Sequence, residues 1–292
     1  MQITPGPGPL GARITGIDLG QPLADADRRS LLRALGAHGV LCFPAQRMEV
    51  DAFAAFGARF GALEVNVANL FHEPGHPEVM VLSNMVENGK PVGLNDAGQG
   101  WHTDMSYSTD VALANILHAQ RVPVRHGKPL GETQFRDMRA AYRDLPEALK
   151  QKLAGRSATH DFEKFWEEMR KRPGSRRKPL TAEQKARKPP VSQPIFRTHP
   201  ITGETVLYAN PGYTLFIDGM DAQESGEILD FLFRHQDRAE YLYAHHWAEG
   251  DVLMWDNIGT MHNAVADYLP GEARYMRRMQ VMASLDYAAL VA

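Results

Sequence analysis

The sequence has 292 residues, of which 43% are hydrophobic and 23% are charged. This composition is typical of a folded globular chain and excludes a disordered, collagen-like or coiled-coil protein. Lys plus Arg number 32 and Asp plus Glu number 35, a formal net charge of −3, which excludes a global positive field that would draw the molecule to nucleic acid or an anionic membrane. The one cysteine, Cys42, excludes an intramolecular disulfide and any site built from several cysteines.

The start of the chain and its apolar runs bear on where the protein works. No apolar run approaches the ~18–20 residues of a membrane span. Residues 1–6 have neither the basic start nor the apolar stretch of a signal peptide. We therefore expect a cytoplasmic protein that binds neither membranes nor nucleic acid. Cys42 lies in the apolar segment Val40–Phe43 and is expected to be a buried core thiol.

The first hundred residues predict strands, two helices and a polar loop. Loose alternation and short apolar runs predict strands at 12–19, 40–43 and 79–83. Apolar residues at helical spacing predict a helix around residues 31–35 and a second one through Phe53, Phe56 and Phe60. The Gly/Asn/Asp stretch 93–100 predicts a loop of the kind that often carries function.

Short strands dominate the remainder of the chain. We expect a helix at about Met138–Leu153 and another that opens at Asp221. Strand signals are found at 101–107, 112–119, 194–198, 205–210, 214–217, 251–256 and 275–284. Many short strands with a few helices predict one mainly β domain over residues 1–292, a sandwich or barrel with helical padding.

Residues 163–190 differ in composition from the rest, with ten Lys or Arg against four Glu and several Pro. Such a stretch is either a solvated, flexible excursion or a basic lid over an anionic substrate. We favour a lid-like insertion at about residues 160–190 because of the chemistry that flanks it. Four aromatic side chains either line a substrate pocket or its lid, or are ordinary packing residues: Phe162, Trp166, Tyr213 and Phe216.

The segment Trp101-His102-Thr103-Asp104 carries the most informative chemistry. If it is a strand, His102 and Asp104 point to the same face and can meet on one metal ion. A lone His-x-Asp occurs by chance in many proteins, but His262 follows a predicted strand near the C-terminus. Two histidines and one carboxylate form the facial triad of non-haem Fe(II) oxygenases, which leaves positions open for co-substrate and dioxygen.

Two arginines follow His262 at a spacing that suits anion binding. Arg274 and Arg278 are four residues apart and share one face of a strand, whereas Arg277 points the other way. Guanidinium groups bind carboxylates or sulfonates in a bidentate manner. Because buried arginines without anionic partners are costly, bound anions are a reasonable inference.

Over nearly its whole length the chain resembles the TauD/TfdA family of Fe(II)- and 2-oxoglutarate-dependent dioxygenases. The resemblance implies a mainly β fold with flanking helices, a double-stranded β-helix (jelly roll, cupin-like). It also implies oxidative decarboxylation of 2-oxoglutarate to succinate and CO2, coupled to hydroxylation of a small organic acid. The motifs that carry it, in order, are 14–19, 38–40, Trp101–Asp104, 131–135, 198–203, Trp255–Asn257, His262, 267–270, Arg274 and Arg278.

The family's cofactor residues can be placed on this sequence. The resemblance assigns Fe(II) to His102, Asp104 and His262. Thr133 matches the threonine that hydrogen-bonds 2-oxoglutarate, and Arg274 matches the arginine that pairs with its distal carboxylate. Dioxygen is the remaining co-substrate.

Residues expected to contact the prime substrate differ from those of the taurine enzyme. Arg278 matches the arginine that reaches the acidic group of sulfonates and aryloxyalkanoates, with Arg277 as the alternative. Asn66 and Asn69 stand where the taurine enzyme has a histidine and a tyrosine, and Asn95 lies in the loop that binds the amine end. The pocket is therefore remodelled, and we expect a small anionic organic substrate other than taurine.

Two other functions remain open from the residues. A metal-dependent hydrolase could use the same His/Asp/His site with Zn(II), although it would not need a dicarboxylate pocket. A non-catalytic cupin-like sensor would have a broken triad. The adjacent His245 and His246 face opposite sides of a predicted strand, so they cannot chelate one ion together. As in the family, we expect a homodimer or homotetramer.

Overall fold

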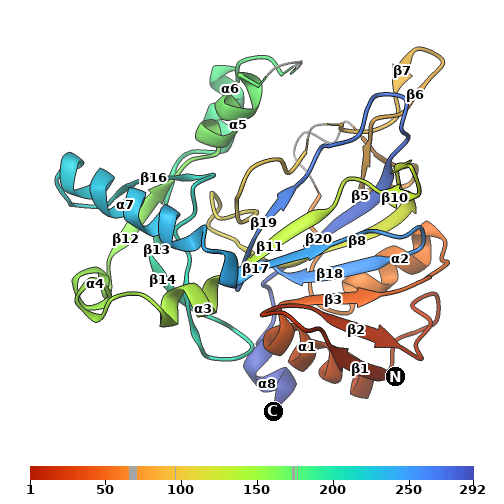
Figure 1. The fold of residues 1–292 in the computed structure, drawn as a ribbon, viewed down its shortest axis with the longest axis horizontal. Helices are drawn as coiled ribbons and strands as arrows, with labels where there is room; N and C mark the ends of the chain where they lie inside the picture. The colour runs from red at the N-terminus through yellow and green to blue at the C-terminus, as the bar shows by residue number, and fades with distance from the viewer. Residues whose placement is uncertain (66–70, 96, 173–174, 176) are drawn as a thin grey trace.

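The computed structural model describes residues 1–65, 71–95, 97–172, 175 and 177–292. Its largest sheet has the strand order β1-β2-β3-β18-β8-β20-β5-β4 (Figure 1). Neighbouring strands are antiparallel except β2 and β3, which are parallel. These strands are β1 (Gln2–Pro5), β2 (Ala12–Thr15), β3 (Val40–Phe43), β18 (Val252–Asp256), β8 (Ala112–Arg121), β20 (Tyr275–Met282), β5 (His76–Ser83) and β4 (His72–Glu73).

Both faces of this large sheet are covered, which explains why its central strands are apolar throughout. In β18, Val252 and Met254 belong to the core on one face, and Leu253 and Trp255 belong to the core on the other. Helices α1 (Asp25–His38) and α2 (Val50–Ala58) pack against strands of the sheet on the side of the first core. We call this side the helix-covered face and the opposite side the inner face.

A three-stranded sheet packs against the inner face. Its order is β17 (Leu242–His245), β11 (Thr133–Asp137) and β19 (Thr260–Ala264), all antiparallel. The ring of Phe135 on β11 meets that of Trp255 on β18 at a centroid distance of 5.4 Å. The chain therefore forms the mainly β sandwich with flanking helices that its strand pattern predicts.

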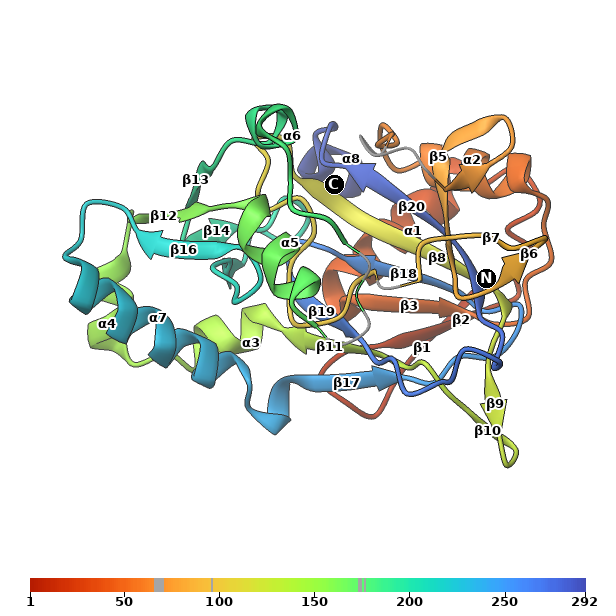
Figure 2. The ribbon, with the colours of Figure 1, turned by 90° about the horizontal axis from the view of Figure 1, so that it is seen from above.

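A second group of elements lies beside the two facing sheets (Figures 1 and 2). The prediction of one continuous helix over 138–153 is wrong. Pro146 adopts an extended ψ of 134° and separates two shorter helices. The elements of this group are α3 (Met138–Arg143), α4 (Glu147–Leu153), β12 (Ser157–His160), β13 (Val191–Pro194), β14 (Phe196–Thr198), β15 (Thr205–Leu207), β16 (Thr214–Ile217) and α7 (Ala222–Gln236).

The basic stretch forms two helices, α5 (Phe162–Arg170) and α6 (Ala182–Arg187), which stand together at the top of Figure 1. No helix among the described residues is long and apolar enough to span a bilayer. The remaining elements are β6 (Val86–Glu87), β7 (Lys90–Pro91), β9 (Val124–Arg125), β10 (Lys128–Pro129), the 3-10 helix η1 (Ala239–Tyr241) and α8 (Tyr287–Val291).

Candidate active site

A cavity of about 250 Å³ opens between the two facing sheets and helix α5. Most of its wall is apolar, while its ionisable groups come from the residues that the sequence singles out. The apolar lining includes Phe71, Pro77, Met80, Leu82, Leu94, Leu117, Phe162, Phe165, Trp166, Tyr213 and Trp255. The polar lining includes His102, Asp104, Thr133, His262, Arg274 and Arg278.

Three of these polar side chains converge on one point of the cavity wall. His102 Nε2 lies 3.4 Å from Asp104 Oδ1, and His262 Nε2 lies 3.5 Å from Asp104 Oδ2. The two imidazole centroids are 4.2 Å apart. These donor atoms could hold one metal ion, and two neutral imidazoles with one carboxylate suit Fe(II).

The predicted strand over 101–107 is wrong, although the residues placed on it do meet. His102 forms an isolated antiparallel bridge with His262, with reciprocal backbone hydrogen bonds of 3.1 and 3.0 Å. Asp104 lies in a turn, where the Asn257 side chain donates a 2.8 Å bond to its carbonyl. Met105 has a φ of 58°. Backbone pairing and a turn, rather than strand alternation, therefore bring His102 and Asp104 together.

Contacts around His102 fix the orientation of its ring. The Nδ1–H donates to the carbonyl of Gly100 at 2.7 Å, which leaves the Nε2 lone pair facing Asp104. The ring packs against Phe165 at a centroid distance of 4.8 Å. A Cβ at Gly212 would come within 2.6 Å of the His102 Cβ, so glycine is required for this close approach.

The charges of the cluster favour metal binding. Burial raises the pKa of Asp104, but Arg278 and the two histidines outweigh it, so the pKa lies well below its ordinary value. Burial, together with His102 and Arg278, lowers the pKa of His262 well below its ordinary value. The carboxylate is therefore ionised and the His262 imidazole neutral at physiological pH, the states that coordinate a metal.

Strand β20 directs its arginines to opposite sides, as the alternation predicts. Arg278 faces the cavity, and its Nη2 donates to Asp104 Oδ2 at 2.5 Å and to Asn115 Oδ1 at 3.0 Å. Arg277 lies on the helix-covered face, where its Nε donates to Glu73 at 2.7 Å. Only Arg278 of this pair lines the cavity.

Arg274 and Thr133 line another part of the cavity wall. Arg274 is 8% exposed, its buried Nε has no hydrogen-bond partner, and burial lowers its pKa. Within the described ranges no carboxylate pairs with this guanidinium, which lies over the Tyr268 ring. Thr133 Oγ1 accepts a 3.0 Å bond from Trp247 Nε1. A buried cation without an anionic partner fits the acidic end of a bound ligand.

Of the loop residues predicted to contact substrate, the structure describes only Asn95. Asn95 is exposed and does not line the cavity, whereas Leu94 beside it does. Asn66 and Asn69 lie outside the described residues. The roles of all three stay predictions.

Helix α5 contributes aromatic side chains that the sequence indicates only in part. The expectation that aromatic side chains line the pocket or lid is confirmed for Phe162, Trp166 and Tyr213. Phe216 does not line the cavity and is 49% exposed. Phe165 was missed, although it lies three residues after Phe162 and so on the same face of the helix. Arg177 also lines the cavity, with its guanidinium 4.6 Å from the Trp166 ring centroid.

Comparison with known proteins agrees with this geometry. The sequence model of the Taurine catabolism dioxygenase TauD, TfdA family matches residues 2–280. Pentalenolactone F synthase of Streptomyces avermitilis is 33% identical, over 96% of this chain and 93% of its own. The alpha-ketoglutarate-dependent 2,4-dichlorophenoxyacetate dioxygenase of Cupriavidus pinatubonensis is 31% identical, over 87% of this chain and 88% of its own.

Solved structures share the fold. A taurine dioxygenase from Burkholderia xenovorans superposes with a TM-score of 0.76 and 28% identity, over 96% of this chain and 90% of that one. AAD-2, solved in complex with Mn(II) and N-oxalylglycine, gives 0.78 and 27%, over 97% of this chain and 98% of that one. These likenesses confirm the jelly-roll fold class and support an oxygenase rather than a metal-dependent hydrolase. The chain belongs to the TauD/TfdA family and is an Fe(II)- and 2-oxoglutarate-dependent dioxygenase.

Proposed function

We propose that His102, Asp104 and His262 hold the iron and that the enzyme hydroxylates a small organic acid with an apolar body. The convergence of two imidazole nitrogens and one ionised carboxylate on a single point carries this proposal. Bound Fe(II), with 2-oxoglutarate and dioxygen, supplies the oxidation of a C–H bond with release of succinate and CO2. The residues of this chain bind the two acids, orient them and exclude water.

We assign the distal carboxylate of 2-oxoglutarate to Arg274 and Thr133. The Arg274 guanidinium is buried and lacks a carboxylate partner among the described residues, so a bound dicarboxylate would neutralise it. Thr133 Oγ1 accepts from Trp247 and keeps its own hydroxyl proton to donate. Both side chains line the same cavity as the metal-binding cluster.

Arg278 is the proposed partner for the acidic group of the prime substrate. Among the described residues its guanidinium donates to one oxygen of Asp104 and to the amide oxygen of Asn115, both through Nη2, so further N–H groups remain for a carboxylate or sulfonate. An acid held there would lie beside the metal-binding cluster. This placement brings a nearby C–H bond into reach of the iron.

The apolar wall supports a substrate larger and less polar than taurine. Met80 and Leu82 of β5, Leu117 of β8 and Phe165 of α5 all line the cavity. Burial of an aromatic or aliphatic body against them is favourable at roughly 25 cal/mol per Å² of apolar surface. We infer an aryloxyalkanoate or another apolar carboxylate; one relative is named for 2,4-dichlorophenoxyacetate.

The segment at about 160–190 is the proposed lid of a single domain. Its helix α5 brings Phe162, Phe165 and Trp166 onto the cavity. Aromatic side chains in this position would exclude water, while the surrounding Lys and Arg would attract an anion. We also propose that the enzyme is cytoplasmic and that it forms a homodimer or homotetramer. Light scattering after gel filtration tests the oligomeric state, and a monomer at working concentration would contradict it.

An anaerobic titration tests the proposed function. Fe(II) and 2-oxoglutarate added to the metal-free protein should give a weak visible metal-to-ligand charge-transfer band. Phenoxyacetates should shift this band, whereas taurine should shift it little. Tight iron binding with no band on addition of 2-oxoglutarate would contradict the proposal. A shift with taurine alone would contradict the inferred substrate class.

A further inference from the structure

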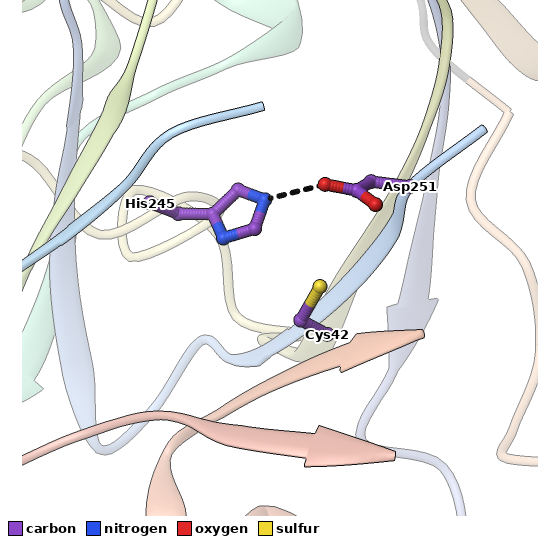
Figure 3. Close-up of side chains that lie close together, drawn as sticks. All are labelled: Cys42, His245 and Asp251. Atoms are coloured by element: carbon purple, nitrogen blue, oxygen red, sulfur yellow. Dashed lines mark ion pairs between the residues drawn. The ribbon is translucent and has the colours of Figure 1, made fainter. Parts of the chain in front are cut away.

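A second group of potential metal ligands lies away from the cavity. Cys42 on β3, His245 on β17 and Asp251 just before β18 place one ligand atom each within 4.8 Å of one another. All three residues are buried, with exposures of 6–8%. Figure 3 shows the thiol of Cys42 directed toward the space between the imidazole and the carboxylate. None of the three lines the cavity of the active site.

One nitrogen of the His245 imidazole is not satisfied by its neighbours, whereas Nδ1 faces the Tyr243 hydroxyl at 3.5 Å. Its Nε2 is buried and makes no hydrogen bond, although Asp251 Oδ2 lies 3.3 Å away. That carboxylate oxygen already accepts a 3.0 Å bond from the backbone of Ala248. A buried imidazole nitrogen without a hydrogen bond is costly unless another partner occupies the space that it faces.

The spacing of these atoms matches that of the proposed iron ligands. The nitrogen–oxygen distance of 3.3 Å at His245 compares with 3.4 and 3.5 Å at His102 and His262. Two ligands about 2.1 Å from a tetrahedral ion lie about 3.4 Å apart. A hydrogen-bonded pair would be shorter and aligned. The distance and the missing hydrogen bond therefore both suit a shared cation.

We propose that Cys42, His245 and Asp251 supply three of the four ligands of a second, structural metal site that takes Zn(II). Thiolate, imidazole and carboxylate are all zinc ligands, and the redox-inert ion suits a buried position. The three residues join the edge strand of the small sheet to the large sheet, so the ion would stabilise the contact between them.

Zinc binding at this site must displace a proton. Burial, helped by Asp251, raises the pKa of the Cys42 thiol to about 12, so the metal-free thiol is protonated at neutral pH. On binding, the thiol proton passes to the buffer as the zinc–sulfur bond forms. No electron transfer is involved.

Cobalt(II) is a suitable probe because a cobalt–thiolate bond absorbs in the near ultraviolet. Cys42 is the one cysteine of the chain, so any such band from the wild-type protein reports this residue. Anaerobic titration of the metal-free full chain should bind two equivalents of cobalt and develop the band. Zinc should bleach it. One equivalent without a thiolate band would overturn the proposal.

Two variants separate the sites. Cys42→Ser should bind one equivalent of cobalt and lack the band, and zinc should raise its melting temperature less than that of the wild-type protein, because only the His102, Asp104 and His262 cluster remains. His102→Ala should also bind one equivalent but keep the band. Two equivalents in Cys42→Ser would overturn the proposal. If that variant does not fold, the wild-type spectrum alone decides, and the result is independent of dioxygenase activity.

Discussion

Two buried histidine–carboxylate groups differ in what surrounds them. His199 Nε2 lies 2.9 Å from Asp256 Oδ2, and both side chains are fully buried. Two backbone amides donate to the other oxygen of Asp256, and two more donate to Nδ1 of His199. In the cluster of His102, Asp104 and His262, the donor atoms face a cavity instead.

This difference separates a structural pair from a binding site. Backbone amides bind Nδ1 of His199 and Oδ1 of Asp256, and the remaining Nε2 and Oδ2 atoms face each other, so the pair presents no atom to a cavity. At the proposed metal cluster, the side chain of Arg278 rather than a backbone amide occupies the outer side of Asp104. A ligand can therefore reach the proposed metal cluster from the cavity, whereas the His199–Asp256 pair is enclosed by the fold.

The largest effects should come from removing one histidine of each group. His102→Ala should lose iron binding and lower turnover by at least ~10³-fold, because two ligands cannot keep the metal in place. His199→Ala should cost on the order of 3 kcal/mol of unfolding free energy by leaving Asp256 unpaired. Metal analysis and denaturant melts of both variants measure this. Full activity in His102→Ala, or iron loss from folded His199→Ala, would break the comparison.

Arg274→Ala should weaken 2-oxoglutarate binding about 100-fold, or ~2.7 kcal/mol, since a buried bidentate ion pair is lost. Anaerobic titration of the charge-transfer band gives the Kd directly. Arg274→Lys should restore part of the affinity, because it keeps the charge without the planar geometry. An unchanged Kd in Arg274→Ala would remove this residue from the co-substrate site.

The two faces of β20 offer a matched pair of variants. Arg278→Ala should raise the KM for the prime substrate at least ~10-fold and affect 2-oxoglutarate much less. Arg277→Ala removes an equal charge from the helix-covered face, where the side chain pairs with Glu73, and should leave both KM values nearly unchanged. Equal increases in both KM values for Arg278→Ala would mean that its role is misassigned.

The last effect concerns pH and stability and lies outside both groups. Burial lowers the pKa of His160 from 6.5 to about 3. At pH values between these two, His160 is protonated in the unfolded chain and neutral in the folded chain. The free energy of unfolding therefore falls by about 1.4 kcal/mol for each unit by which the pH falls. His160→Gln should flatten this slope in denaturant melts from pH 7 to 4. The control His246→Gln alters an exposed histidine and should keep the wild-type slope.

Short motifs predict the chemistry better than the backbone that presents it. The histidines, the aspartate and the inward side of Arg278 follow from residue type and from alternation along β20. The local conformation of 101–107 does not, because a long-range bridge to β19 replaces the predicted strand. Such pairing depends on residues far away in sequence, which no local pattern encodes.

The apolar wall illustrates a different limit. Met80, Leu82 and Leu117 read as ordinary strand core in the sequence, and nothing local distinguishes a side chain that faces a cavity from one that faces another strand. Cys42 was rightly expected to be buried, but its neighbours His245 and Asp251 come from other strands. Clusters that several strands build together become visible only in three dimensions.

The bridge between His102 and His262 has a consequence for the order in which the site forms during protein synthesis. His102 and Asp104 are synthesised well before His262, Arg274 and Arg278. A nascent polypeptide carries His102 and Asp104 without the partner that orients them. The three-residue centre can therefore form only once His262 has been synthesised, and products that terminate before this residue lack a complete metal site.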